Sequence, residues 1–263
     1  MSAIFVSGIA IAAPGLNDWQ LAMPVLRGER AYEPTPLGPL APALLPANER
    51  RRMTTTIKLA VQVAQDALPA QDAVDELHCV FVSGMGDCDI TDKVCRALAQ
   101  PERPVSPTHF HNSVHNAPAG YFAIATRSQA PSLSIAADQA SFAAGLLEAA
   151  TQVAAEKAAV LLVAYDTLPP EPIRAKSGLT ADFGTALLLT PQPLASARHR
   201  LELELESGAE PDRLTDPALE QLRLSNPMAR SLPLLAALAG DRGGRVRLPY
   251  LDDLTVRIEL QPC

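Results

Sequence analysis

Short apolar runs of strand length alternate with helical segments along most of this sequence, and this alternation limits the folds open to it. Ala159–Tyr165, for example, has the composition of a strand that is buried on both faces of a sheet. Asn17 and Asn48 are the expected N-caps of the first two helices. We therefore expect an α/β fold in which helices cover a largely buried sheet. The pattern predicts strands at 2–12, 77–83, 132–136, 159–165 and 183–189, and helices at 17–26, 48–68, 90–99, 112–127 and 140–157.

The last third of the chain follows other patterns. Residues 199–206 alternate leucine with glutamate, which is the period of a strand with one wet face. Residues 227–239 are predicted to form a helix, and 245–248 and 254–260 a terminal hairpin. Because no pattern marks a second domain, we expect a single domain over residues 1–263.

Composition disfavours several classes of protein. Apolar residues make up 48% of the 263 residues, enough for a sizeable core, and the net charge of −7 disfavours a nucleic-acid surface. No apolar run approaches the roughly 20 residues that span a bilayer. The first basic residue is Arg27, so no secretory signal is expected. The four cysteines lack the paired spacing of a zinc site, which favours reduced thiols in a cytoplasmic protein.

One segment combines a strand, a sharp turn and the start of a helix rich in small residues. Residues 132–142 read SLSIAADQASF. This is the layout of a nucleophile elbow, in which the turn presents one side chain at a helix N-terminus. Backbone N–H groups at such a turn can hold an oxyanion. The side chain at the point of this turn is Gln139, and an amide cannot attack a thioester.

The run HNSVHNAPAG at residues 111–120 makes the comparison with a known family specific. Together with residues 134–141 it resembles the N-terminal half of β-ketoacyl synthases. In that family a Ser-Ile-Ala strand leads into Thr-Ala-Cys, whose cysteine accepts the acyl group, and the alignment places Gln139 on that cysteine. RRM at 51–53 and SGMGD at 83–87 are similar to two further family segments.

This resemblance covers about residues 2–190. It implies a thiolase-like, layered α/β/α fold in which residues 1–190 form the thiolase-type N-terminal half and 191–263 a reduced C-terminal extension. SPT at 106–108 and LLVAYD at 161–166 are similar to the short ketosynthase-like proteins of aryl polyene clusters, called chain length factors.

Condensing enzymes of this family also use two histidines, or a histidine and an asparagine, from their C-terminal half, one of them in a His-Gly-Thr motif. After Asp166 this chain has only His199, which lacks that context. The resemblance therefore implies a non-catalytic chain length factor that pairs with a catalytic ketosynthase. It would act in aryl polyene or polyketide biosynthesis, contact acyl carrier protein transiently and need no cofactor.

No catalytic residue is expected, and Gln139 is interpreted as filling the pocket of the cysteine. The alternative is an enzyme: a decarboxylase, since some loading ketosynthases carry glutamine here, or a condensing enzyme with another nucleophile. A third hypothesis is a binding protein that only reuses the fold. The residues expected at the acyl tunnel or the subunit interface are His111, Ser113, His115, Asn116, Ile135, Asp138, Gln139 and Phe142.

Three other groups of side chains have both a functional and a plain interpretation. His109, His111 and His115 could bind a metal, but no suitably spaced carboxylate accompanies them, and capping or interface roles are favoured. Asp87, Asp89 and Asp92 could form a calcium loop, but a solvated helix N-terminus is favoured. Cys88 is a second possible nucleophile and is interpreted as an ordinary thiol. The stripe formed by Met53, Ile57 and Val61 could line a tunnel and is interpreted as core.

Overall fold

One mixed sheet runs through the whole protein. The computed structural model describes residues 3–69, 76–240 and 242–263. The sheet has eight strands in the order β3-β2-β4-β5-β1-β6-β8-β7. Strands β3, β2 and β4 are parallel, whereas every pair from β4 onward to β7 is antiparallel. The strands are β1 (Ile4–Ala12), β2 (His78–Val82), β3 (Ser132–Ile135), β4 (Val160–Asp166), β5 (Phe183–Thr190), β6 (His199–Ser207), β7 (Gly244–Pro249) and β8 (Leu254–Pro262).

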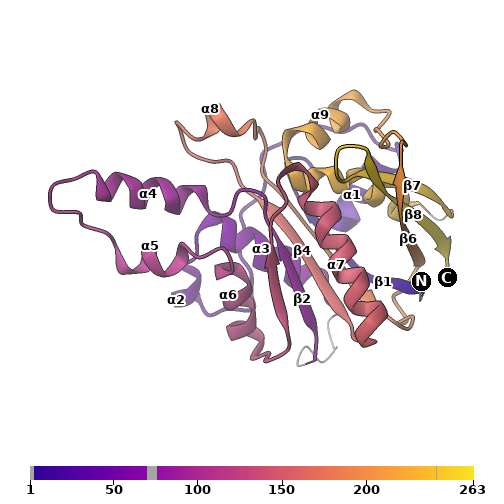
Figure 1. The fold of residues 1–263 in the computed structure, drawn as a ribbon, viewed down its shortest axis with the longest axis horizontal. Helices are drawn as coiled ribbons and strands as arrows, with labels where there is room; N and C mark the ends of the chain where they lie inside the picture. The colour runs from indigo at the N-terminus through magenta and orange to yellow at the C-terminus, as the bar shows by residue number, and fades with distance from the viewer. Residues whose placement is uncertain (1–2, 70–75, 241) are drawn as a thin grey trace.

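Helices cover both faces of this sheet, which gives the layered α/β/α arrangement that the resemblance implied. Helices α3 and α6 pack on one face, and α1, α7 and α10 pack on the other. Figure 1 shows α7 lying across the sheet, while α4 and α5 project together from one side. The helices are α1 (Trp19–Leu26), α2 (Ala47–Arg50), α3 (Thr55–Asp66), α4 (Cys88–Leu98), α5 (Pro107–Asn112), α6 (Ala117–Thr126), α7 (Ser141–Glu156), α8 (Arg174–Ser177), α9 (Pro217–Ser225) and α10 (Leu232–Ala239), with 3₁₀ turns η1 (Asp138–Ala140) and η2 (Pro227–Ser231).

The central strands and α7 pack closely against each other. All seven residues of β4 are buried, as expected for a strand covered on both faces. Gly145 allows α7 to approach the sheet closely, because a Cβ at this position would lie 2.3 Å from Cγ2 of Val82. The stripe of Met53, Ile57 and Val61 is buried against Leu45 and Ala117, so its interpretation as core is confirmed.

Two predicted helices are each interrupted. The segment predicted as one helix from Asn48 contains α2 and α3, because Thr54 starts a new helix by accepting a hydrogen bond from the Ile57 N–H. Likewise, the helix predicted at 112–127 is wrong in its first part. There α5 ends at Asn112, and α6 begins at Ala117 with Pro118 in its first turn, where proline is tolerated.

Other boundaries differ by smaller amounts. The first helix is capped by Asp18, which accepts from the Leu21 N–H, and not by Asn17. Helix α9 was missed, although Asp216 followed by Pro217 is a common start signal for a helix. The region predicted as a helix at 227–239 begins as η2 and continues as α10, and the terminal hairpin is confirmed as β7 and β8. Ser2, at the start of the first predicted strand, lies outside the described residues.

Candidate functional site

The predicted elbow is present at the end of β3. The chain leaves the strand after Ile135, forms the 3₁₀ turn η1 and enters α7 at Ser141. Asp138 has a φ of 48°, a left-handed conformation that is rare and costly for a residue with a side chain. The buried Ser141 hydroxyl holds this turn, because it donates to the Asp138 carbonyl at 2.7 Å and accepts from the Ala137 N–H at 2.9 Å.

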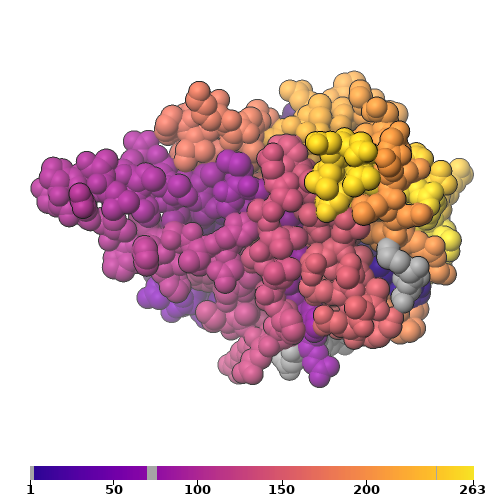
Figure 2. Space-filling view, in the orientation of Figure 1, coloured from indigo at the N-terminus to yellow at the C-terminus, as the bar shows by residue number. Residues whose placement is uncertain are grey.

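Gln139 projects from the elbow into a cavity of about 300 Å³. Its side chain is exposed, and Oε1 accepts a hydrogen bond at 3.2 Å from Nη2 of Arg230 in η2. Figure 2 shows the yellow C-terminal segment directly beside the segment that leads into α7. Both segments contribute residues to the lining of the cavity. The lining residues are Gln139, Glu210, Pro211, Arg213, Arg223, Arg230, Pro249 and Tyr250.

The residues that face the elbow from the C-terminal part are therefore three arginines, a glutamate, two prolines and a tyrosine. Among the described residues that line this cavity there is no histidine. His199 pairs with Val6 at the start of β1. The strand register places this pair at one end of the sheet and the pair of Gly184 and Tyr165 at the opposite end. A nucleophile placed at Gln139 would consequently have no imidazole beside it from this half of the chain.

A buried carboxyl group lies behind the elbow at the end of β4. Asp166 is fully buried and accepts hydrogen bonds from the Ser83 hydroxyl at 2.6 Å and from the N–H groups of Gly84 and Met85 at 3.0 and 3.1 Å. Burial raises the pKa of Asp166 to about 6, while these three hydrogen bonds and His115 act to lower it. The carboxyl therefore ties the turn after β2 to β4.

The turn after β2 contacts both the elbow and the connection between α5 and α6. A Cβ at Gly84 would lie 3.3 Å from the Asp138 carbonyl oxygen, so the two turns are in close contact. On its other side, Nε2 of His115 lies 3.1 Å from the Ser83 carbonyl oxygen. His115 thus makes a backbone contact from the α5–α6 connection.

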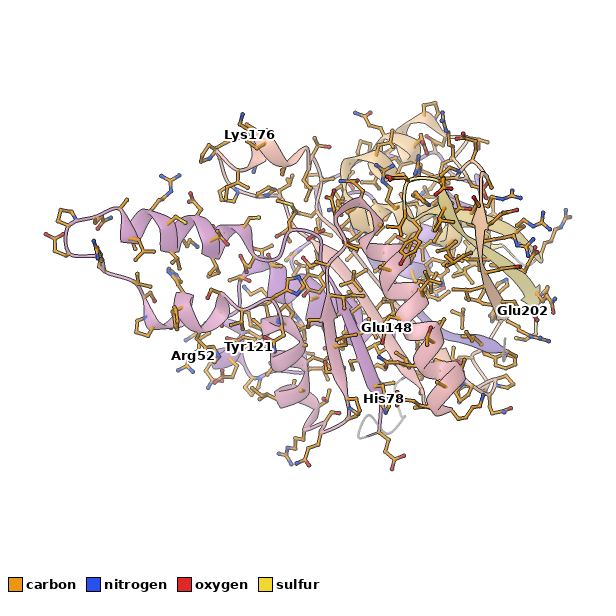
Figure 3. The ribbon with its side chains drawn as sticks, in the orientation of Figure 1. Arg52, His78, Tyr121, Glu148, Lys176 and Glu202 are labelled. Carbon is orange, nitrogen blue, oxygen red and sulfur yellow. The ribbon has the colours of Figure 1, made fainter. Side chains whose placement is uncertain are left out.

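A groove of about 700 Å³ lies between α2, α5 and α6. His111 and Asn116 line it, as do Arg52 and Tyr121, which Figure 3 labels next to each other. Large apolar side chains are exposed around it and on the neighbouring edge strand β3: Phe110 (68% exposed), Val114 (54%), Ile124 (72%) and Leu133 (38%). Such a patch is unusual on an isolated protein surface.

The predicted site residues thus fall into two neighbouring groups. His111, Ser113, His115 and Asn116 are exposed around the α5–α6 connection. Asp138 and Gln139 are exposed at the elbow, and Ile135 is half-buried at the end of β3. Phe142, at the start of α7, is buried in the core, so its side chain faces the sheet.

The other candidate groups have structural roles here. His111 lies in α5 and His115 beyond its end, so the two do not share one helix. Asp87 caps α4, and Asp89 and Asp92 form ion pairs with Lys93 and Arg96. Within residues 3–69, 76–240 and 242–263, no three His, Cys, Asp or Glu side chains gather closely enough to hold a metal ion.

Cys88 is placed unfavourably for a nucleophile. Burial, together with the nearby Asp166 and Asp87, raises the pKa of its thiol, and its Sγ lies 3.6 Å from the Met85 carbonyl oxygen. Because the thiolate is the reactive form, these surroundings favour an unreactive thiol.

Sequence reasoning missed the cationic side of the elbow. Arg223 and Arg230 belong to no motif, and they line the cavity beside Gln139 only because α9 and η2 fold back over the end of the sheet. Asp166 stood in a family-like run, LLVAYD, but its contacts with the turn at Ser83 join residues far apart in sequence.

Comparison with known families agrees with this geometry. The family described as "Beta-ketoacyl synthase, N-terminal domain" matches residues 27–244, so the chain belongs to the β-ketoacyl synthase family. No curated protein matches the chain significantly. No helix in the described ranges is long and apolar enough to cross a membrane.

Solved structures of the thiolase-like ketosynthase fold are similar over nearly the whole chain. A chain of the "Ketosynthase (ApeO) in Complex with its Chain Length Factor (ApeC) from Xenorhabdus doucetiae" has a TM-score of 0.75 at 22% identity, covering 98% of this chain and 99% of that one. A chain of "The ishigamide ketosynthase/chain length factor" has a TM-score of 0.74 at 13% identity, with 99% of both chains covered. A chain of the complex "AntDE:AntF", described as a type II PKS acyl-carrier protein with its ketosynthase, has a TM-score of 0.76 at 11% identity, covering 100% and 99%.

Proposed function

We propose that this protein is a non-catalytic chain length factor that pairs with a catalytic β-ketoacyl-carrier-protein synthase in aryl polyene or polyketide biosynthesis. Its place is the cytoplasm, and it meets acyl carrier protein through the pair. The observation that carries the proposal is the elbow itself. It keeps the strained turn at Asp138 but presents Gln139, hydrogen-bonded to Arg230, where a condensing enzyme needs a nucleophile.

The surface beside the elbow supports a protein partner. Strand β3 is at the edge of the sheet, so one side of its backbone has no neighbouring strand in the described part of the chain. Leu133 on this edge and Ile124 on α6 expose apolar surface to water. A ketosynthase subunit that covered this face would pair the free edge of β3 and bury the exposed apolar side chains. An obligate interface of this kind commonly buries about 2,000 Å² or more.

The test compares the protein alone with the protein co-expressed with a catalytic ketosynthase from its gene neighbourhood. We expect a stable heterodimer by size-exclusion chromatography with light scattering, and extended acyl chains only when both subunits are present. A stable monomer that ignores the ketosynthase at micromolar concentration contradicts the proposal. So does chain extension by the pure protein with malonyl and acyl thioesters on carrier protein.

The alternative role, a glutamine-dependent decarboxylase, is opposed by the charge near Gln139. Loss of carbon dioxide from a malonyl group leaves the electron pair of the broken carbon–carbon bond on the thioester as an enolate, which is then protonated. A guanidinium such as Arg230 that pairs with the carboxylate stabilises the reactant and loses this contact as the charge moves to the enolate oxygen, so this pairing raises the barrier. Acetyl-carrier protein formed from malonyl-carrier protein by the purified heterodimer, and lost in Gln139→Ala, would favour the alternative.

A further inference from the structure

The cavity at the elbow carries more positive charge than its surroundings neutralise. Three arginines line it, and the one carboxylate in its lining is the exposed Glu210. Arg223 is 5% exposed and is held by Glu220, with hydrogen bonds of 2.7 and 2.6 Å from Nε and Nη2. Among the lining residues and Glu220 alone, three positive and two negative charges leave a net charge of +1.

Arg230 is the group that needs an anion. It is half-buried, and its guanidinium donates a hydrogen bond to the neutral amide of Gln139. Its Nε atom is buried and, among the described residues, has no hydrogen-bond acceptor. A buried donor without an acceptor is costly, and the carboxylate that acts on Arg230, Glu220, is already paired with Arg223. Burial and the neighbouring Arg223 lower the pKa of Arg230, while Glu220 acts to raise it.

We propose that this cavity is a binding site for a compact anion, a carboxylate or a phosphate monoester, held by Arg230 with Arg213 at the rim. The planar guanidinium can donate two parallel hydrogen bonds to either group. Gln139 contributes from the opposite wall, because its Oε1 is engaged by Arg230 while its amide N–H groups can donate to the anion. A volume of about 300 Å³ accommodates a group of this size.

The inference does not depend on pairing with a ketosynthase, because the cavity is formed by this chain alone. Its walls come from the elbow, from the segment before α9, from η2 and from the turn between β7 and β8. The C-terminal part of the chain therefore has a chemical role at the elbow in addition to extending the sheet.

Isothermal titration calorimetry of the full-length protein with malonate and with inorganic phosphate, at constant ionic strength, tests the site. We expect saturable binding of at least one of them. Arg230→Gln should weaken it about tenfold or more, since a charge-assisted contact is lost. Arg30→Gln is the matched control, because Arg30 is exposed and lies outside the cavity, and it should leave binding unchanged. Tighter binding of malonate identifies a carboxylate ligand, and tighter binding of phosphate identifies a phosphate ester.

Thermal unfolding gives a second measurement that does not rely on ligand affinity. Arg230→Met removes a half-buried cation, so without added anion the melting temperature should rise by about 2–4 °C. The stabilisation by malonate or phosphate seen in the wild type should be absent in this variant. The proposal is overturned if neither anion binds beyond the ionic-strength control, or if Arg230→Gln binds both as tightly as the wild type does.

Discussion

The two sides of the elbow have opposite surfaces. On the side of β3, α5 and α6, large apolar side chains such as Ile124 and Phe110 are exposed around a wide groove. On the side of α9 and η2, a smaller cavity is lined by three arginines. An apolar face on an edge strand suits a protein partner, whereas a small cationic cavity suits a small anion. One turn of the chain thus separates two surfaces with different chemistry.

The largest effect is expected on the apolar side. Leu133→Glu places a charge in the middle of the proposed interface, so pairing with the ketosynthase should weaken by more than about a hundredfold. Leu133 is partly exposed on the edge strand, so the monomer should still fold. Leu21→Glu, a change of a leucine on α1 that is 50% exposed against 38% for Leu133, is the control. Equal pairing of the two variants in a pull-down assay would place the interface elsewhere.

The cationic side can be tested through its internal ion pair. Arg223→Leu leaves the partly buried carboxylate of Glu220 without its guanidinium, so the protein should lose about 1–2 kcal/mol of unfolding free energy. The double variant with Glu220→Gln should recover much of that loss. Urea denaturation measures both. Similar stability of Arg223→Leu and the wild type would show that this pair does not hold the wall of the cavity.

Asp166, between the two sides, should make stability depend on pH. Its pKa is about 6 in the folded protein against 3.8 for the ordinary group, so the folded state binds the proton more tightly. Stability from this group is therefore full below about pH 4 and is lost as pH rises through 6, a change on the order of 3 kcal/mol.

Asp166→Asn should be less stable at every pH, because the N–H groups of Gly84 and Met85 then share a single acceptor oxygen. The difference in unfolding free energy between wild type and variant should nevertheless shrink from pH 4 to pH 7. A constant difference over this range would mean that Asp166 titrates normally.

The smallest effect is expected at the elbow itself. Gln139→Cys should not produce condensing activity, since no histidine of the described ranges lines the cavity to form or use a thiolate. A radiolabelled acyl-transfer assay should show no chain extension by the variant protein alone. An extended product would show that another side chain near the elbow transfers the proton.

Local sequence patterns predicted the strands and helices whose apolar residues form one continuous run or recur with a single helical or strand period. The buried strand β4 was recognised from its apolar run and α7 from its helical stripe. The elbow followed from the order strand, turn, helix, and the structure adds the strained residue, Asp138. The predicted helix over 112–127 was wrong in its first part because the mostly polar residues 113–116 separate α5 from α6, and Pro118 lies in the first turn of the second helix.

The amino-acid sequence by itself determined the α/β class, through the alternation of strands and helices along the chain, and also the elbow and its glutamine, which lie within residues 132–142. The tertiary structure alone decided what faces that glutamine. Arg230 and Gln139 are 91 positions apart, and their contact depends on η2 returning over the end of the sheet. Asp166 and Ser83 are likewise 83 positions apart. Such contacts result from the burial of whole faces of helices and strands, which no short pattern contains.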